Sequence, residues 1–283
     1  MELLNPAADD TVIAALDAVA QPAYGQASFA SQFRWAAAAQ PDGLVMAVEG
    51  GTVLGVGSAV AYPDAGFGWI GLIATLPAVQ RRGIGEAVTE RCAEILRRYG
   101  CAPVLDASAA GAPLYERMGF VDHGRTTILQ YGGQRSAPTP GIPGDRIRAM
   151  SPADLATVTE LDHAAFGARR PALLAAMTTD RPSRSVVLER DGVPVGFAVA
   201  QETGIGPLVG PDVAGIAALV DTMVTAVWAN PPRVMAPAGT ATRDDLVALG
   251  FQPARELRHM RRGIDTLPTD AVRYAGRATL GLG

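Results

Sequence analysis

A glycine-containing segment with the sequence Gln-Arg-Arg-Gly-Ile-Gly occupies positions 80–85. It lies between a strand-like run at 67–76 and an amphipathic helical pattern that continues to about residue 98. Glycines where a strand turns into a helix let a ligand approach the backbone closely, because they carry no Cβ. The N–H groups at the helix start then point outward, with the positive end of the helix dipole behind them. Together with Arg81 and Arg82, which can add charge-assisted contacts, this pattern predicts a pyrophosphate site.

The same letters would also fit a tight turn with two surface arginines, because a lone Gly-x-Gly is a weak signal. Two better-known phosphate motifs do not fit. A Rossmann fingerprint requires Gly-x-Gly-x-x-Gly, whereas this segment follows the strand predicted at 67–76, which is not the first strand, and lacks the last glycine. A P-loop requires Gly-Lys-Ser/Thr, and this chain contains no lysine. An enzyme of unrelated chemistry that binds a nucleotide phosphate here stays open as an alternative.

A second motif follows downstream, and the two motifs in this order resemble the GNAT superfamily of N-acetyltransferases. Gln80-x-x-Gly83-x-Gly85 looks like the acetyl-CoA signature of that family. Tyr115, on a short predicted helix that ends at Gly119-Phe120, looks like its second landmark. The segments 69–71 and 105–108 are similar to tandem GNAT proteins whose second domain is a divergent copy. The resemblance extends over nearly the whole chain, including residues 205–209.

The resemblance implies how acetyl-CoA is bound. Backbone groups of Ile73, Ala74 and Thr75 would hold the pantetheine arm and polarise the thioester carbonyl. Ser108, where the family often has Asn, would contact the cofactor. The pyrophosphate would be held by the signature segment and the residue that follows it: Gln80, Arg81, Arg82, Gly83, Ile84, Gly85 and Glu86.

Tyr115 is the catalytic residue that the resemblance implies. Attack of an amine on a thioester expels a thiolate, and a positioned phenol can protonate it or donate a hydrogen bond to it. The alternative is a tyrosine packed in the core with its hydroxyl bonded locally. No general base is predicted, because residues 69–75 carry no carboxylate. Asp64 lies in the loop before this strand and Asp106 at the end of the next one. A solvated role is favoured for Asp64 and a helix-entry or turn role for Asp106, and a water relay is equally open.

The predicted reaction is direct transfer of an acyl group, most simply acetyl, to a primary amine. A small-molecule acceptor is favoured over a protein. Trp35 and Trp69 could line its pocket, although core packing is their default role. The alternative function is a non-catalytic acyl-CoA-binding sensor or scaffold. Tyr115 separates the two functions, because a pure binding module does not need it.

Strand and helix patterns occur twice in the same order, which predicts an α/β (α+β) protein with two copies of one fold. The resemblance implies that both copies are GNAT-like domains. Each domain would be a mixed, mostly antiparallel sheet flanked by helices. The predicted boundaries are an N-terminal domain at 1–131, a Gly/Pro-rich linker at 132–144, a degenerate domain at 145–262 and a tail at 263–283. The elements predicted in the first half are helices at 9–19, 29–39, 84–98 and 111–118, and strands at 44–48, 53–62, 67–76, 104–107 and 125–131. Those in the second half are strands at 145–150, 185–189, 193–201, 204–209, 234–237 and 255–261, with helices from 151, at 213–228 and at 243–249.

The second copy has lost the features that bind a cofactor. In an alignment of the halves, 64 positions separate Gly55 from Gly119, but only 54 separate Gly196 from Gly250. The missing residues fall where the first half has its glycine-rich segment. Leu246 stands at the position of Tyr115. We therefore expect one coenzyme A per chain, with the second domain walling the acceptor cleft or fixing the relative positions of the halves.

Charge and composition exclude other classes of protein. The formal charge of −4 gives no basic surface for nucleic acid. The longest apolar run, 53–61, is too short to span a bilayer, and residues 1–6 do not resemble a signal peptide. Two cysteines and three histidines lack metal-ligand spacing, so we predict no metal. These features favour a cytoplasmic protein without a membrane partner.

Overall fold

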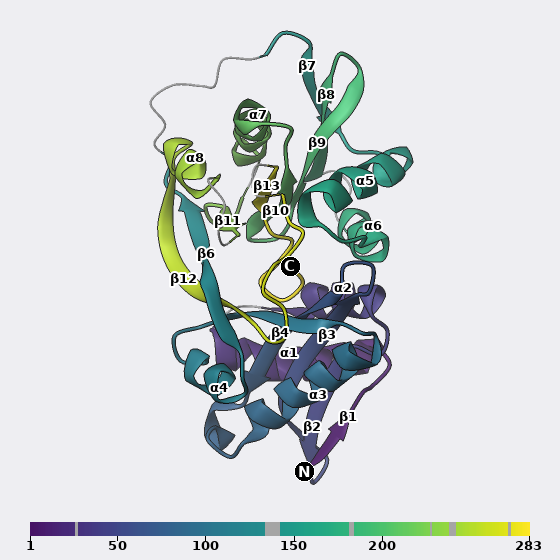
Figure 1. Ribbon diagram of the computed structural model, residues 1–283, viewed down its shortest axis with the longest axis vertical. Helices are drawn as coiled ribbons and strands as arrows, with labels where there is room; N and C mark the ends of the chain where they lie inside the picture. Colours follow the sequence, from purple (N-terminus) through teal and green to yellow (C-terminus); the bar gives the residue numbers. More distant parts are fainter. Residues whose placement is uncertain (26–27, 134–141, 181–183, 227, 238–241, 271–272) are drawn as a thin grey trace. The chain divides into compact units, whose positions relative to one another are not determined.

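The structure is a computed structural model of residues 1–283, and it describes all of them except 26–27, 134–141, 181–183, 227, 238–241 and 271–272. The chain divides into two compact units (Figure 1). Unit 1 contains residues 1–122, 260–266 and 280–283, and unit 2 contains residues 123–259 and 267–279. Most of the linker predicted at 132–144 lies outside the described residues.

Unit 1 is a sheet with helices on it, in strand order β1-β2-β3-β4-β5. The first four strands run antiparallel to their neighbours, whereas β4 and β5 are parallel. The strands are β1 (Glu2–Leu4), β2 (Leu44–Glu49), β3 (Thr52–Tyr62), β4 (Phe67–Thr75) and β5 (Ala102–Ala107). The helices are α1 (Asp10–Tyr24), α2 (Ala30–Ala39), the 3₁₀ turn η1 (Pro77–Val79), α3 (Ile84–Arg98) and α4 (Ala112–Arg117).

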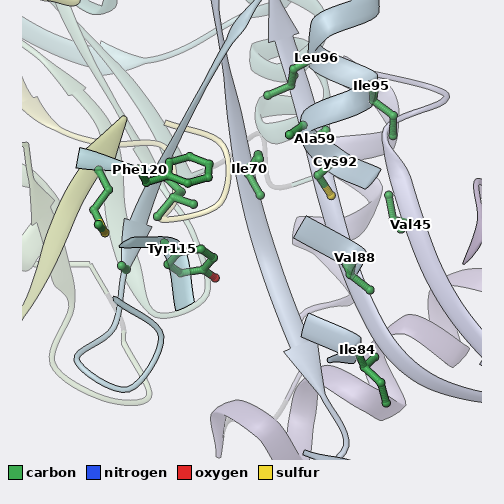
Figure 2. Close-up of a cluster of buried hydrophobic side chains, with 14 of the residues drawn as sticks. Val45, Ala59, Ile70, Ile84, Val88, Cys92, Ile95, Leu96, Tyr115 and Phe120 are labelled. Atoms are coloured by element: carbon green, nitrogen blue, oxygen red, sulfur yellow. The ribbon is translucent and has the colours of Figure 1, made fainter. Parts of the chain in front are cut away.

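The core of unit 1 lies between the sheet and α3. Apolar residues recur along α3 at helical spacing and pack on the strands. Figure 2 shows four of them, Ile84, Val88, Cys92 and Ile95, on the side of α3 that faces the sheet. Glycines in β3 make this close packing possible, because a Cβ on Gly55 would lie 2.5 Å from the Ile84 side chain. The sheet therefore fixes where α3 begins, which is the position of the predicted cofactor segment.

Unit 2 has the same plan, in strand order β7-β8-β9-β10-β11-β6-β12, with β13 paired to β10. Its strands β10 and β11 are parallel, as β4 and β5 are in unit 1. The strands are β6 (Val121–Tyr131), β7 (Asp145–Ala149), β8 (Ser185–Arg190), β9 (Val193–Ala200), β10 (Gly204–Val209), β11 (Arg233–Ala236), β12 (Phe251–Arg261) and β13 (Tyr274–Gly276). The helices are η2 (Pro152–Asp154), α5 (Leu155–Phe166), α6 (Pro171–Asp180), α7 (Val213–Val224) and α8 (Thr242–Ala248).

The predicted fold class is confirmed, because the strands of each unit pair in a mixed, mostly antiparallel pattern and are flanked by helices. Some elements differ from the prediction. The helix predicted to end at residue 19 continues to Tyr24, because Pro22 lies in the last turn, where its missing N–H costs one hydrogen bond. Strands β1 and β13 and helix α6 were not predicted. Each unit is formed by separate stretches of the chain, because residues 260–266 and 280–283 belong to unit 1. The predicted domains are continuous ranges, and those boundaries stay predictions.

Candidate functional site

Strands β4 and β5 separate after a short ladder, and this opening is the centre of the candidate site. Their paired residues run only from Phe67 to Trp69 on β4. Three residues further along, Leu72 has φ +54°, and the β3–β4 register shifts beside it. Such an irregularity re-aims the backbone that follows. The end of β4 is therefore directed away from β5, which exposes its edge to a ligand.

The backbone of the glycine-containing segment leaves the start of α3 without a side-chain cap. Arg81 has φ +65°, and Gly83, the residue before the helix, has φ +79°. The N-cap residue of α3, Gly83, has no side chain that could accept a hydrogen bond from the first turn. The first N–H groups of a helix have no partner within the helix and need one outside it. A Cβ on Gly83 would meet no atom within 4 Å, so there is room beside these groups. This geometry fits an anionic group such as a pyrophosphate.

The two arginines of the segment differ in their partners. Arg82 donates two hydrogen bonds to the Glu49 carboxylate, at 3.1 and 2.9 Å. These bonds and the charge of Arg82 hold the pKa of Glu49 below its usual value. Arg81 is exposed at its left-handed backbone position. The Arg82–Glu49 pair was not predicted, because a pairing between residues 33 positions apart leaves no sequence pattern.

Ile73, Ala74 and Thr75, which are predicted to hold the pantetheine arm, are the last residues of β4. Ala74 is buried, whereas Ile73 and Thr75 are partly exposed. The hydroxyl of Tyr24, at the end of α1, donates to the Ile73 carbonyl oxygen at 2.6 Å. Helix α1 thus reaches β4 within the candidate site, through a residue that sequence reasoning missed.

Tyr115 lies in the core of unit 1 with its ring edge-on to Phe120, at a centroid distance of 5.9 Å (Figure 2). Burial raises the pKa of its hydroxyl to about 12, the nearby Cys92 thiol acts in the same direction, and a hydrogen bond with Thr89 opposes them. Thr89 itself donates to the Gly85 carbonyl at 2.7 Å. The Tyr115 hydroxyl is therefore directed toward the first turns of α3, one helical turn beyond Gly85.

Ser108 follows β5 and closes the turn into α4. Its hydroxyl oxygen accepts a hydrogen bond from the Gly111 N–H at 3.1 Å, and its carbonyl oxygen accepts from Ala112. Tyr115 is adjacent, because a Cβ on Gly111 would lie 3.2 Å from its ring. The structure therefore brings Ser108 and Tyr115 together at the start of α4.

The other residues considered from the sequence are more dispersed. Asp64 is exposed in the turn before β4, and Asp106 is partly buried near the end of β5. Trp35 is buried in α2, and Trp69 is fully buried. Among the described residues, no group of three or more His, Cys, Asp or Glu side chains could hold a metal ion. Within the same residues, no helix has the length and apolar character needed to cross a membrane.

The equivalent helix start in unit 2 is already capped. Asp212 precedes α7, and its carboxylate accepts from the Gly215 N–H at 2.8 Å. Arg190 donates to the same carboxylate at 2.9 Å. The place that an anion would take at this helix is therefore filled by a side chain of the unit itself.

The strand opening in unit 2 is also filled. Strands β10 and β11 pair only at Gly204 and Ile205, and β13 then pairs with β10 at Leu208 and Val209. Arg277, directly after β13, donates its N–H to the Met235 carbonyl of β11 at 3.0 Å. Residues 274–277 thus form hydrogen bonds with both separated strands of unit 2. In unit 1, the equivalent opening is predicted to hold the cofactor.

Comparisons with known proteins match each half separately. The acetyltransferase (GNAT) family profile matches residues 10–120, and an acetyltransferase (GNAT) domain profile matches residues 158–274. None of the curated proteins compared with the chain matches it.

Solved structures share the fold over almost the full length of the chain. A candidate acetyltransferase from Pyrococcus horikoshii is 24% identical with a TM-score of 0.82, over 99% of this chain and 96% of that one. A GCN5-related N-acetyltransferase from Sphaerobacter thermophilus is 17% identical with a TM-score of 0.62, over 95% and 98%. A tandem GNAT protein from the clavulanic acid biosynthesis pathway is 15% identical with a TM-score of 0.61, over 92% and 97%. These likenesses concern the fold.

Proposed function

Because the chain belongs to the GNAT family of acetyltransferases, with one GNAT domain in each half, we propose that unit 1 transfers an acetyl group from acetyl-CoA directly to a primary amine. The observation that carries this proposal is the uncapped start of α3 beside the separated edge of β4. A small-molecule amine is the proposed acceptor. When bound, acetyl-CoA supplies the activated acyl group.

Two sets of backbone groups in unit 1 would bind the two parts of acetyl-CoA. The N–H groups from Arg81 to Glu86 hold the pyrophosphate, because those at the helix start have no partner within the helix. Backbone groups of Ile73, Ala74 and Thr75 hold the pantetheine arm along the edge that β5 leaves open. Gln80 and Ser108 flank the two ends of this path. No side-chain charge is needed at the thioester, which is neutral.

Tyr115 holds the proton that the leaving thiolate takes. With a pKa of about 12, its hydroxyl is almost fully protonated at neutral pH. A phenol that keeps its proton can act as a general acid but not as the base that deprotonates the amine. The step balances as follows: a C–N bond forms, the C–S bond breaks, and the thiolate receives the Tyr115 proton. The amine gives a proton to solvent, and solvent returns one to the Tyr115 phenolate.

A panel of primary amines incubated with acetyl-CoA tests the proposal. The expected result is amine-dependent release of free thiol, together with one acetyl group on the amine by mass spectrometry. The reaction without amine is the control, because it measures hydrolysis alone. A chain that binds acetyl-CoA but acetylates none of the amines would favour the non-catalytic sensor or scaffold instead.

A further inference from the structure

Residues Leu280–Gly283, here called the return segment, pack against β3 and β4 within unit 1. The Tyr62 hydroxyl donates to the Leu282 carbonyl at 2.6 Å, and the Trp69 indole N–H donates to the Leu280 carbonyl at 3.0 Å. Both aromatic side chains are buried, and Leu282 is 0% exposed. The segment is therefore fixed to the sheet by two backbone carbonyls.

A pair of glycines allows the return segment to touch β4. A Cβ on Gly71 would lie 2.1 Å from the Gly281 Cα, which is closer than any real contact. A Cβ on Gly281 would lie 3.2 Å from the Leu72 side chain. The two backbones are thus in direct contact at the residue before the irregular Leu72.

The return segment covers the face of β4 opposite to α3. Side chains alternate between the two faces along a strand. A Cβ on Gly68 would lie 2.4 Å from Leu96 of α3, so the Gly68 position faces that helix. Trp69 and Gly71 point to the other face, where the return segment lies. Trp69 is also the last β4 residue paired with β5.

This position leads to the proposed acyl-transfer site. The phosphates are proposed to bind at α3, on one face of the sheet, and the thioester at Ile73, two residues beyond Gly71. An amine that approaches the carbonyl from the face that α3 does not cover would pass the return segment, which lies beside the opening. We propose that Leu280–Leu282 forms the acceptor-side wall of the site, and that the Leu280 side chain selects amines by size. This inference rests on the proposed function.

Leu280 is the residue of the segment best suited to contact an acceptor. It is partly exposed, whereas Gly281 and Leu282 are buried. Its link to Trp69 uses the backbone carbonyl, so a change of its side chain leaves that hydrogen bond in place. Replacement of Leu280 by alanine therefore alters the wall without removing the anchor of the segment.

The test compares kcat/KM for a compact amine, ethylamine, with that for a bulky one, benzylamine. Leu280→Ala should raise the bulky-to-compact ratio by about fivefold or more, because three carbons are removed from the wall. Trp69→Phe, which removes the anchoring N–H together with part of the buried indole ring, should shift the same ratio. The matched controls are Leu4→Ala, at the β1 edge, and Trp228→Phe, which loses an indole N–H bond to the Met223 carbonyl in unit 2. Acetyl-CoA affinity should stay within about twofold in all four variants.

A ratio that stays within twofold of wild type in both Leu280→Ala and Trp69→Phe would overturn the inference while leaving the proposed function intact. If the wild type binds acetyl-CoA but acetylates no amine, the proposed function fails and hydrogen exchange decides the inference. The exchange rate of amides 281–282 should then fall by a factor of about three or more when acetyl-CoA is bound, because the proposed position of the thioester is beside them. Unchanged exchange would place the segment outside the site. A chain that binds no acetyl-CoA would overturn both.

Discussion

Tyr115 combines burial, a raised pKa and a position beside the start of α3, and these features suit a proton donor. Tyr115→Phe should lower kcat by ~10²-fold or more, as expected for loss of a general acid. Affinity for acetyl-CoA should stay nearly unchanged, because the ring and its packing on Phe120 remain. Steady-state kinetics with calorimetry measures both quantities.

The control for this variant is Tyr131→Phe, which removes a tyrosine hydroxyl in unit 2 and should leave kcat unchanged. The raised pKa of Tyr115 also determines its protonation state at alkaline pH. A pKa of about 12 keeps the Tyr115 proton at pH values where an ordinary tyrosine, with a pKa near 10, would lose it. An undiminished kcat in Tyr115→Phe would mean that the hydroxyl has only a packing role.

Gly83 permits a matched test of the phosphate site. Gly83→Glu should abolish acetyl-CoA binding, because the new carboxylate would lie in the space beside the uncapped N–H groups and repel phosphate. The substitution also strains a backbone at φ +79°. Gly263→Glu controls for that strain, since Gly263 has the same φ and also meets no atom within 4 Å of a Cβ. Calorimetry should find wild-type affinity in Gly263→Glu; equal loss in both variants would indicate strain alone.

The sequence predicted the types of residue in the candidate site better than their contacts. The uncapped start of α3 follows from local glycines, so a local pattern could predict it. The Arg82–Glu49 pair, the Tyr24 hydrogen bond to Ile73 and the return segment on Trp69 join residues far apart in the chain. Such contacts depend on the packed fold, and no spacing in the sequence encodes them.

At the scale of elements, α3 and α7 follow the strand openings of the two units, and they differ in their caps. Asp212 caps α7, whereas α3 has no side-chain cap. Asp9 caps α1 with a bond of the same 2.8 Å length and provides a comparison. Asp212→Ala should lower the free energy of unfolding by ~0.5–2 kcal/mol, the range for loss of a cap, and Asp9→Ala should do the same. Chemical denaturation measures this, and acetyl-CoA affinity should not change with Asp212→Ala. A loss of affinity would mean that α7 takes part in cofactor binding.

The Asp212 contribution should depend on pH. Partial burial raises the pKa of Asp212, but hydrogen bonds from Gly215 and Arg190 outweigh it and hold the pKa below its usual value. The folded state thus favours the carboxylate, so its stabilisation is present above the unfolded pKa of about 3.9 and is lost as the pH falls through the lower folded value. The stability difference between wild type and Asp212→Ala should be constant from pH 5 to 8 and shrink below pH 4. A stability difference that did not shrink as the pH falls below 4 would contradict this.

Elements with clear periodicity were predicted, and those held by distant partners were not. Helix α3 has a distinct apolar face, and its predicted end at Arg98 is confirmed. Helix α6 contains the run Ala-Leu-Leu-Ala-Ala-Met, which is apolar on all sides and gives no helical period. Strand β13 has three residues and exists through its pairing with β10, more than sixty positions earlier. Its sequence alone, Tyr-Ala-Gly, predicts nothing.

At the scale of the whole molecule, two copies of one fold should bind one coenzyme A. In unit 1 the helix start is uncapped, and the pairing of β4 with β5 ends at Trp69. In unit 2, Asp212 occupies the helix start, β13 pairs with β10, and the next residue, Arg277, hydrogen-bonds to β11. A second cofactor would have to displace a carboxylate and a strand, and its phosphates would lose water without gaining equivalent hydrogen bonds. Isothermal titration of the full chain should therefore saturate at one equivalent of acetyl-CoA. Gly83→Glu should reduce this to none, and Asp212→Ala should leave it at one, because β13 still fills the opening. Two equivalents in the wild type, or one surviving in Gly83→Glu, would assign a working cofactor site to unit 2.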